Sequence, residues 1–222
     1  TNAYCTFVNG GEKVKPILID RVQDRRGKTL FNADKRKCIG CNEISHTSNR
    51  IPTIESNFNK VISAESAYQM VSMLEGVVKR GTGRKLKSLN LPLAGKTGTT
   101  NKNMDAWFIG FTSNIVIGVY VGFDEPASLG KYETGAKAAL PIFKNFVQKT
   151  LSKSDTLPFK VPKGVTLIMV DSENGKVPNL STKNIIYEAF KKEDSHNFLK
   201  FSFNKNDSNL KSSNETTKLY FY

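Results

Sequence analysis

This sequence is short of long apolar runs, of cysteine and of histidine, and each shortage excludes a class of protein. Its longest apolar stretch, residues 115–123, is about half of the roughly 20 residues that a membrane helix needs. No basic segment followed by an apolar one opens the chain, as it would in a secretory signal. A four-ligand zinc site around Cys38 and Cys41 would lack its second half, because the only other cysteine, Cys5, lies in an apolar stretch typical of a helix. We therefore expect no metal ion and no other cofactor.

Acidic residues are also few, since 20 Asp and Glu stand against 33 Lys and Arg, which gives a net charge of +13. Such a bias suits a nucleic acid or an anionic membrane or cell-wall surface. The basic residues are scattered, apart from short runs such as residues 35–37, and they do not alternate with aromatic residues as base stacking requires. We therefore expect no nucleic-acid partner and interpret the charge as a solvated basic surface.

The length allows one full domain with a sizeable core and a small appendage. Residues 1–8 are typical of the last turns of a helix that Asn9-Gly10-Gly11 would stop, so we expect a piece of a longer polypeptide. We assign residues 1–151 to the C-terminal part of a domain and residues 152–190 to a small β-hairpin appendage. Residues 191–222 are rich in Lys, Asn, Ser and Asp with few apolar residues, and this composition predicts a disordered polar tail.

Within residues 1–151 the patterns predict two helices, three strands and a hairpin. Ser63 is placed as the N-cap of a helix whose apolar residues recur at helical spacing: Ala67, Val71, Leu74 and Val78. Gly81-Thr82-Gly83 is expected to end this helix. A second helix is expected after Thr134-Gly135, with either its start or a kink near Pro141, and with one apolar face: Ala138, Ala139, Ile142, Phe143, Phe146 and Val147.

Strands are expected over residues 91–99, 106–112 and 115–123, and the last two form an antiparallel pair because only a short turn joins them. An earlier hairpin is expected over residues 14–31, with its turn at Asp24-Arg25-Arg26-Gly27, followed by a polar, loop-like stretch to residue 60. In the appendage, a strand over residues 165–171 and a turn over residues 172–175 indicate a second hairpin.

The triplet Lys96-Thr97-Gly98 leaves an apolar segment and enters a polar turn, as in serine acyltransferases that attack β-lactams and D-Ala-D-Ala peptides. Gly95-Lys96-Thr97 also matches the end of a phosphate-binding P-loop. That motif needs glycine at position 90, which is Asn90, and a helix that starts at the lysine. Gly98 and the turn after it disfavour such a helix, so we reject a P-loop.

Further blocks follow in a fixed order around the triplet: Phe7-Val8-Asn9-Gly10-Gly11, Arg80-Gly81-Thr82-Gly83, Asp105-Ala106-Trp107-Phe108-Ile109-Gly110 and Glu133-Thr134-Gly135. These segments resemble the transpeptidase domain of the bifunctional class A penicillin-binding proteins, and the resemblance as a whole covers roughly residues 3–178. The resemblance implies an α+β fold in which helices flank an antiparallel sheet, of which this chain holds only the C-terminal portion. It also implies that the active site runs along the strand that carries the triplet.

The activity that the resemblance implies is that of a serine-type D,D-transpeptidase. A nucleophilic serine attacks the D-Ala-D-Ala carbonyl of a peptidoglycan stem peptide, D-Ala leaves, and an amine of a neighbouring stem peptide takes the acyl group. β-Lactams would react at the same site. The location implied is the periplasmic face of the bacterial inner membrane, reached through an N-terminal anchor outside this chain.

The resemblance also assigns roles to the residues of the triplet strand. Lys96 would be catalytic, organising proton transfer and attracting the terminal carboxylate of the substrate. The hydroxyls of Thr97 and Thr99 would bind that carboxylate, and Gly98 would let the substrate backbone lie close to the strand. The backbone N–H of Thr99 would be one of two oxyanion donors.

The family's nucleophile is missing from this sequence. Its Ser-x-x-Lys and Ser-x-Asn motifs should precede the triplet, but no Ser-x-x-Lys occurs before Lys96. Matches that we interpret as chance lie elsewhere: Ser128 to Lys131 in a Pro- and Gly-containing loop, Ser202 to Lys205 and Ser208 to Lys211 in the tail, and Ser88-Leu89-Asn90 just before the strand. We therefore expect the serine to come from a missing N-terminal half, and we expect the isolated chain to be inactive.

In the oxidising periplasm that the resemblance implies, Cys38 and Cys41 are expected to form a local disulfide. Free thiols and a metal site near His46 are the alternatives, and neither His46 nor His196 receives a role. Two other functions for the whole chain stay open. One is a non-catalytic module that binds cell-wall peptide or a partner protein. The other is a basic nucleic-acid-binding protein, which salt-dependent DNA binding would reveal.

Overall fold

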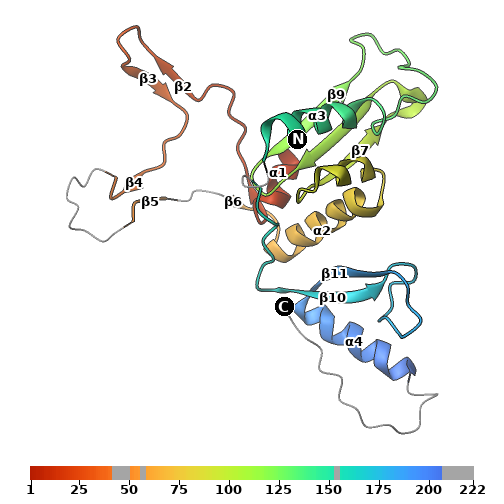
Figure 1. The fold of residues 1–222 in the computed structure, drawn as a ribbon. Helices are drawn as coiled ribbons and strands as arrows, with labels where there is room; N and C mark the ends of the chain where they lie inside the picture. The colour runs from red at the N-terminus through yellow and green to blue at the C-terminus, as the bar shows by residue number, and fades with distance from the viewer. Residues whose placement is uncertain (42–50, 56–58, 153–155, 207–222) are drawn as a thin grey trace.

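A three-stranded antiparallel sheet with helices on both faces forms the central part of the molecule (Figure 1). The computed structural model describes residues 1–41, 51–55, 59–152 and 156–206. The helices are α1 (Asn2–Val8), α2 (Ala64–Arg80), α3 (Ala139–Thr150) and α4 (Lys192–Asn206), with 3₁₀ turns η1 (Arg84–Leu89) and η2 (Asn101–Asn103). The strands are β1 (Glu12–Lys13), β2 (Arg21–Gln23), β3 (Thr29–Asn32), β4 (Cys38–Ile39), β5 (Thr53–Ile54), β6 (Asn59–Lys60), β7 (Ala94–Thr99), β8 (Ala106–Phe111), β9 (Val116–Val121), β10 (Val165–Asp171) and β11 (Ile185–Lys191).

The central sheet has the order β7-β8-β9 and is covered on both faces. Side chains alternate between the two faces of a strand, so Phe108 and Phe111 of β8 lie on opposite faces. The ring of Phe108 packs against Phe143 of α3 at a centroid distance of 4.9 Å. Phe111 packs against Tyr4 of α1 and Val71 of α2. This arrangement agrees with the α+β fold expected from the sequence.

Helix α2 begins and ends where the sequence predicts. Ser63 is its N-cap, because the backbone N–H of Ser66 donates to Ser63 Oγ over 3.2 Å. Gly81 ends the helix, and its N–H donates to Val77 O. The four apolar residues expected on one face are all buried: Ala67, Val71, Leu74 and Val78. The helical spacing of those residues therefore identified the packed face correctly.

Helix α3 also forms, but its buried face differs from the expected one. Four residues of the helix are fully buried: Ala139, Leu140, Phe143 and Val147. Ile142 and Phe146, which we expected on this face, are 52% and 45% exposed. The helix starts at Ala139, so the residues at i, i+4 and i+8 from that start face the sheet, and Ile142 and Phe146 are turned to the flank.

We expect Phe143→Ala to lower the free energy of unfolding by about 3–5 kcal/mol, because a fully buried ring is removed and a cavity is left. Phe146→Ala is the matched control on the same helix. Its half-exposed ring should cost about 1 kcal/mol or less. Urea unfolding followed by circular dichroism measures both. Equal losses in the two variants would contradict the assignment of the buried face.

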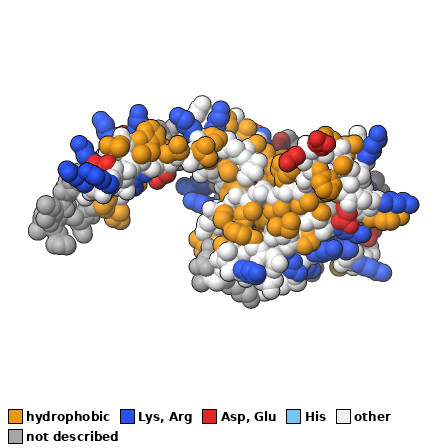
Figure 2. Space-filling view, turned by 90° about the horizontal axis from the view of Figure 1, so that it is seen from above, with side chains coloured by type: hydrophobic (Ala, Val, Ile, Leu, Met, Phe, Trp, Pro, Cys, Tyr) orange, Lys and Arg blue, Asp and Glu red, His pale blue; other side chains and the backbone are white. Residues whose placement is uncertain are grey.

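Within residues 12–60, the described residues form an arm that leaves the central part at β1, which pairs with β6, and reaches far from it (Figure 1). The expected hairpin is present as β2 paired with β3. Its turn is the expected one, because Asp24 Oδ1 accepts from the N–H groups of Arg26 and Lys28, and Gly27 adopts φ +80°. The first strand is shorter than expected, since only Arg21–Gln23 is paired. Figure 2 shows hydrophobic side chains interspersed with Lys and Arg along this arm.

The hairpin of residues 152–190 is built from β10 and β11, which pair in antiparallel register from Val165↔Lys191 to Asp171↔Ile185. The expected turn exists, since the N–H of Gly175 donates to Asp171 O. However, the chain continues through a longer loop to residue 184 before β11 begins. The hairpin contacts α2 through a hydrogen bond from Gln69 Nε2 to Ala189 O of 3.0 Å.

The prediction of a disordered tail from residue 191 is wrong for Lys192–Asn206, which form helix α4 against the β10–β11 hairpin. Ser195 of this helix is buried, and the ring of Phe198 lies 4.6 Å from the ring of Phe190 in β11. Both features stabilise the helix. The composition of the segment did not reveal these tertiary contacts. Residues 207–222 lie outside the described part. None of the described helices is long and apolar enough to cross a bilayer.

Candidate active site

The Lys-Thr-Gly triplet lies on β7, at one edge of the central sheet. In the part of the chain that the structure describes, β7 pairs with β8 and with no strand on its other side. The register places Lys96 opposite Ile109, Thr97 opposite Phe108 and Gly98 opposite Trp107. An edge strand keeps a row of backbone N–H and C=O groups available to an extended peptide. The resemblance implied an active site along the triplet strand, and among the described strands this one has an open edge.

Two backbone hydrogen bonds show which groups face that open edge. The N–H of Thr100 donates to Asp105 O over 3.1 Å, toward β8. Just after β8, the N–H of Thr112 donates to Ile115 O over 3.0 Å, in the direction of β9. The backbone groups of successive β8 residues therefore point alternately toward β7 and toward β9. Because backbone groups alternate in direction along a strand, the N–H and C=O groups of Thr97 and Thr99 face away from β8.

The side chain of Lys96 bends toward the same edge. Its Nζ donates to Thr97 O over 2.8 Å, and the side chain is exposed. Among the described residues, Lys96 forms no salt bridge. A cation is thus held beside the open backbone groups of Thr97 without a carboxylate to neutralise it. This is the electrostatic arrangement that attracts an anionic group to the strand edge.

Each threonine hydroxyl of the strand is held by a neighbouring segment. Thr97 Oγ1 lies 3.0 Å from Thr82 Oγ1, and either hydroxyl can be the donor. Thr99 Oγ1 accepts a hydrogen bond of 3.1 Å from the backbone N–H of Gly135. Gly135 packs so closely on the sheet that a Cβ there would collide with the backbone oxygens of Gly98 and Trp107. Each of the two hydroxyls therefore has a hydrogen-bond partner on a segment outside the sheet.

On the opposite face of the sheet, Gly98 lies beside an aromatic pair. A Cβ on Gly98 would lie 3.1 Å from Trp107 Cβ, and the rings of Trp107 and Tyr120 are 4.6 Å apart. Tyr120 Oη donates to Asp105 Oδ1 over 2.9 Å, and this hydrogen bond is the main cause that raises the pKa of the Tyr120 phenol. Asp105 also accepts from the hydroxyl of Thr100. These bonds stabilise the turn that ends the triplet strand.

Thr82 and Gly135 were not among the site residues expected from the sequence. Gly81-Thr82-Gly83 was interpreted as the stop of a helix, and Glu133-Thr134-Gly135 as a feature of the resemblance without a role. Neither segment is near the triplet in sequence, so only the fold brings them together. The sequence held one weak signal for Thr82. A polar side chain between two glycines that stop a helix needs a hydrogen-bond partner if it is turned inward.

The other residues weighed from the sequence lie apart from this edge. Cys38 and Cys41 are joined as a disulfide in the arm, with Cα atoms 5.7 Å apart. Ser128 lies in a loop, where its Oγ accepts from the N–H of Gly130. His196 Nδ1 lies 3.2 Å from Lys192 O within α4, and His46 is outside the described residues. Across the described ranges, no three His, Cys, Asp or Glu side chains gather to hold a metal ion.

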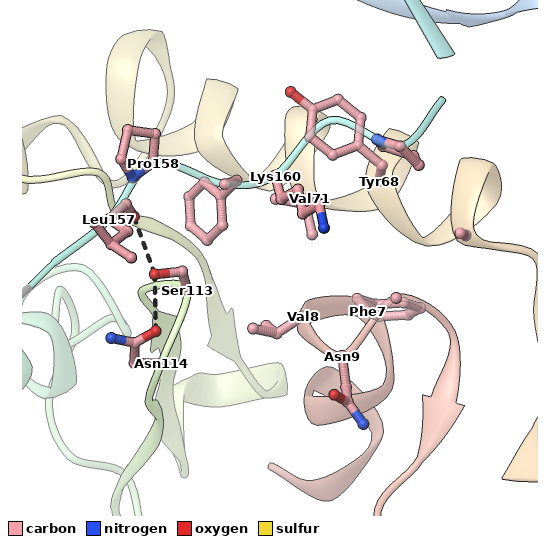
Figure 3. Close-up of a pocket in the computed structure, with 14 residues that line it drawn as sticks. Phe7, Val8, Asn9, Tyr68, Val71, Ser113, Asn114, Leu157, Pro158 and Lys160 are labelled. Atoms are coloured by element: carbon pink, nitrogen blue, oxygen red, sulfur yellow. Dashed lines mark hydrogen bonds between the residues drawn. The ribbon is translucent and has the colours of Figure 1, made fainter. Parts of the chain in front are cut away.

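A pocket of about 470 Å³ lies beside the β8–β9 turn (Figure 3). It is bounded by Phe7 and Val8 of α1, Tyr68 of α2, and the chain around Phe159. The β8–β9 turn closes one side, where Ser113 Oγ donates to Leu157 O over 3.0 Å (Figure 3). Because this turn and the triplet's glycine are at opposite ends of β8, the pocket is separate from the candidate active site.

An open edge strand bearing Lys-Thr-Gly, in an antiparallel sheet between helices, is the arrangement expected of a penicillin-binding transpeptidase domain. A comparison with protein families agrees: the family of the penicillin binding protein transpeptidase domain matches residues 1–148. This chain therefore belongs to that family, which confirms the resemblance seen in the sequence.

Individual relatives support the same assignment. Penicillin-binding protein 1A of Rickettsia conorii is 43% identical over 86% of this chain, and the corresponding protein of Pseudomonas aeruginosa is 33% identical over 86%. The crystal structure of penicillin-binding protein 1A from Haemophilus influenzae matches 84% of the chain at 32% identity, with a TM-score of 0.67. The chain spans only 24% and 27% of the two curated relatives and 31% of the crystallised chain.

Proposed function

We propose that this chain supplies the Lys-Thr-Gly strand of a serine-type peptidoglycan D,D-transpeptidase. The observation that carries the proposal is the open edge of β7, where the uncompensated Lys96 ammonium lies 2.8 Å from Thr97 O beside outward-facing backbone groups. An extended stem peptide that ends in a carboxylate matches such an edge, because strand addition aligns it and the cation attracts its charge. β-Lactams carry a similar carboxylate and would acylate the same enzyme.

In the proposed reaction the nucleophile is a serine outside this chain. Its oxygen attacks the carbonyl carbon of the penultimate D-Ala, and the resulting oxyanion is stabilised by two N–H donors, one of them from Thr99. The C–N bond then breaks, D-Ala leaves with a proton on its amine, and an acyl-serine ester remains. An amine of a second stem peptide attacks this ester and forms the cross-link, which returns the serine. Lys96 would assist proton transfer and hold the terminal carboxylate of the substrate.

The remaining assignments follow from this role. The substrates would be peptidoglycan stem peptides on the periplasmic face of the inner membrane, and the anchor would be part of the missing N-terminal half. That half would also carry the Ser-x-x-Lys motif, which does not occur before Lys96 in this sequence. We define the complete transpeptidase as this chain joined to a transpeptidase segment that carries Ser-x-x-Lys and Ser-x-Asn. The related Rickettsia protein is a source for this segment, provided that its sequence carries both motifs.

We expect the isolated chain to form no covalent adduct with fluorescent penicillin, while the complete transpeptidase forms one. The reason is that only an activated serine can open the β-lactam ring and keep the acyl group. Denaturing gels with in-gel fluorescence measure the adduct, and an excess of unlabelled penicillin should abolish it. A complete transpeptidase that stays unlabelled while folded would contradict the proposed function.

Ser128→Ala is the control for the isolated chain. Ser128 is the serine of the one Ser-x-x-Lys match whose side chains the structure describes, and its loop position suits no nucleophile. A labelled band in the isolated chain that disappears in this variant would overturn the claim of inactivity.

A further inference from the structure

Thr82 belongs to a turn that the structure holds tightly. The N–H groups of Gly81 and Gly83 both donate to Val77 O, each over 3.0 Å. A Cβ on Gly81 would lie 2.9 Å from Val77 Cα, so the turn has no room for a larger residue there. Val78, which follows Val77 in α2, is buried in the core. Thr82 therefore lies in a hydrogen-bonded, closely packed turn at the C-terminal end of α2.

The hydroxyl of Thr82 reaches one residue of the triplet, and the contact lies outside the reaction steps proposed above. Its Oγ1 lies 3.0 Å from Thr97 Oγ1. A hydroxyl has one hydrogen to donate and two lone pairs to accept with. If Thr82 donates to Thr97, the hydrogen of Thr97 remains for another acceptor. If Thr97 donates to Thr82, none remains.

The hydroxyl of Thr99 is also hydrogen-bonded to a neighbouring segment, and in this bond the donor is certain. The backbone N–H of Gly135 can only donate, so Thr99 Oγ1 is the acceptor of that 3.1 Å bond. The hydroxyl hydrogen of Thr99 therefore stays available. A carboxylate has acceptors only, so it selects the state in which both threonines of the strand donate to it.

We propose that Thr82 is a positioning residue: its hydroxyl donates to Thr97 Oγ1 and so presents the Thr97 O–H to the carboxylate of the stem peptide or β-lactam. The inference rests on the proposed function and extends the substrate site to a residue on another element. Thr82 does not touch the substrate in this arrangement. It acts by fixing the rotamer and the hydrogen direction of Thr97, and the chain from Thr82 through Thr97 to the carboxylate is cooperative.

The test is made on the complete transpeptidase with Thr82→Val, which keeps the shape of the side chain and removes its hydroxyl. Because one neutral hydrogen bond is lost, we expect the second-order rate of acylation by penicillin to fall about threefold to tenfold. Thr82→Ser keeps the hydroxyl and should stay within about twofold of the parent. Thr166→Val, on β10 and away from the triplet, is the control for the same change of residue type.

A readout specific to the carboxylate separates positioning from a general loss of structure. The methyl ester of the same penicillin lacks the anion, so its slower acylation should differ by less than about twofold between Thr82→Val and the parent. Adding Thr82→Val to Thr97→Val should cost nothing further, because the partner of Thr82 is already gone.

Three outcomes would overturn the inference: parent-like acylation in a folded Thr82→Val variant, equal losses with the acid and the ester, or a loss in Thr82→Ser as large as in Thr82→Val. Each of these leaves the proposed function standing, because the parent still forms its adduct. A parent that forms no adduct would instead overturn the proposed function and this inference together.

Discussion

Lys96→Ala in the complete transpeptidase is expected to slow acylation by penicillin by about 10³-fold or more. The substitution removes the cation that lies 2.8 Å from Thr97 O at the open edge of β7. Two effects are lost together, because the same group is proposed to attract the carboxylate and to assist proton transfer. The ammonium is exposed and contacts no acidic side chain in the described part of the chain, so its removal should leave the fold intact.

The measurement is the time course of fluorescent penicillin incorporation over a range of concentrations. Lys149→Ala is the matched control, because Lys149 is an exposed lysine at the end of α3, far along the chain from the triplet. It should acylate at the parent rate. Raising the salt concentration should slow the parent more than Lys96→Ala, because the variant has lost the charge that salt would screen. A folded Lys96→Ala variant that acylates like the parent would remove the active-site assignment.

The local elements were predictable from the sequence wherever a pattern and its boundary signal agreed. Helix α2 is the clearest case: a serine cap, four apolar residues at helical spacing and a terminal glycine all indicated the same element, and the buried face matches. The β8–β9 pair was predictable because a short turn joins two apolar strands. Where the start of a helix was ambiguous, as around Pro141 in α3, the predicted face included Ile142 and Phe146, which are half-exposed.

The contacts between distant segments were not predictable in the same way. Helix α4 depends on the ring of Phe190 in β11 meeting Phe198, a contact that the polar composition of the segment hides. The triplet predicted the strand of the candidate site, and the observed sheet order places that strand at the edge of the described sheet. Thr82 and Gly135 are distant from the triplet in sequence, and only the fold brings them to the hydroxyls of Thr97 and Thr99.

Gly98→Val is expected to abolish acylation of the complete transpeptidase for a different reason from Lys96→Ala. The charges stay in place, but a branched side chain is added where Trp107 already lies close to the strand. A Cβ at this position already lies 3.1 Å from Trp107 Cβ, closer than side chains normally approach, and the two further carbons of valine add to this contact. Relief of the contact must shift Trp107 or the β7 strand itself, and either movement disturbs the edge where the substrate would lie.

The single tryptophan of this chain means that the fluorescence of the isolated chain reports the environment of Trp107, so emission is measured on the isolated chain and acylation on the complete transpeptidase. We expect Gly98→Val to change the emission of Trp107, to lose detectable penicillin binding, and to keep the circular dichroism of the parent. Gly98→Ala, with one added carbon, should give a smaller change in emission and a partial loss of acylation, so the two variants form a graded series. Lys96→Ala should leave the emission unchanged and retain weak binding, because it removes attraction without filling space. Parent-rate acylation in a folded Gly98→Val variant would show that the strand edge near Gly98 is not where the acylating ligand lies.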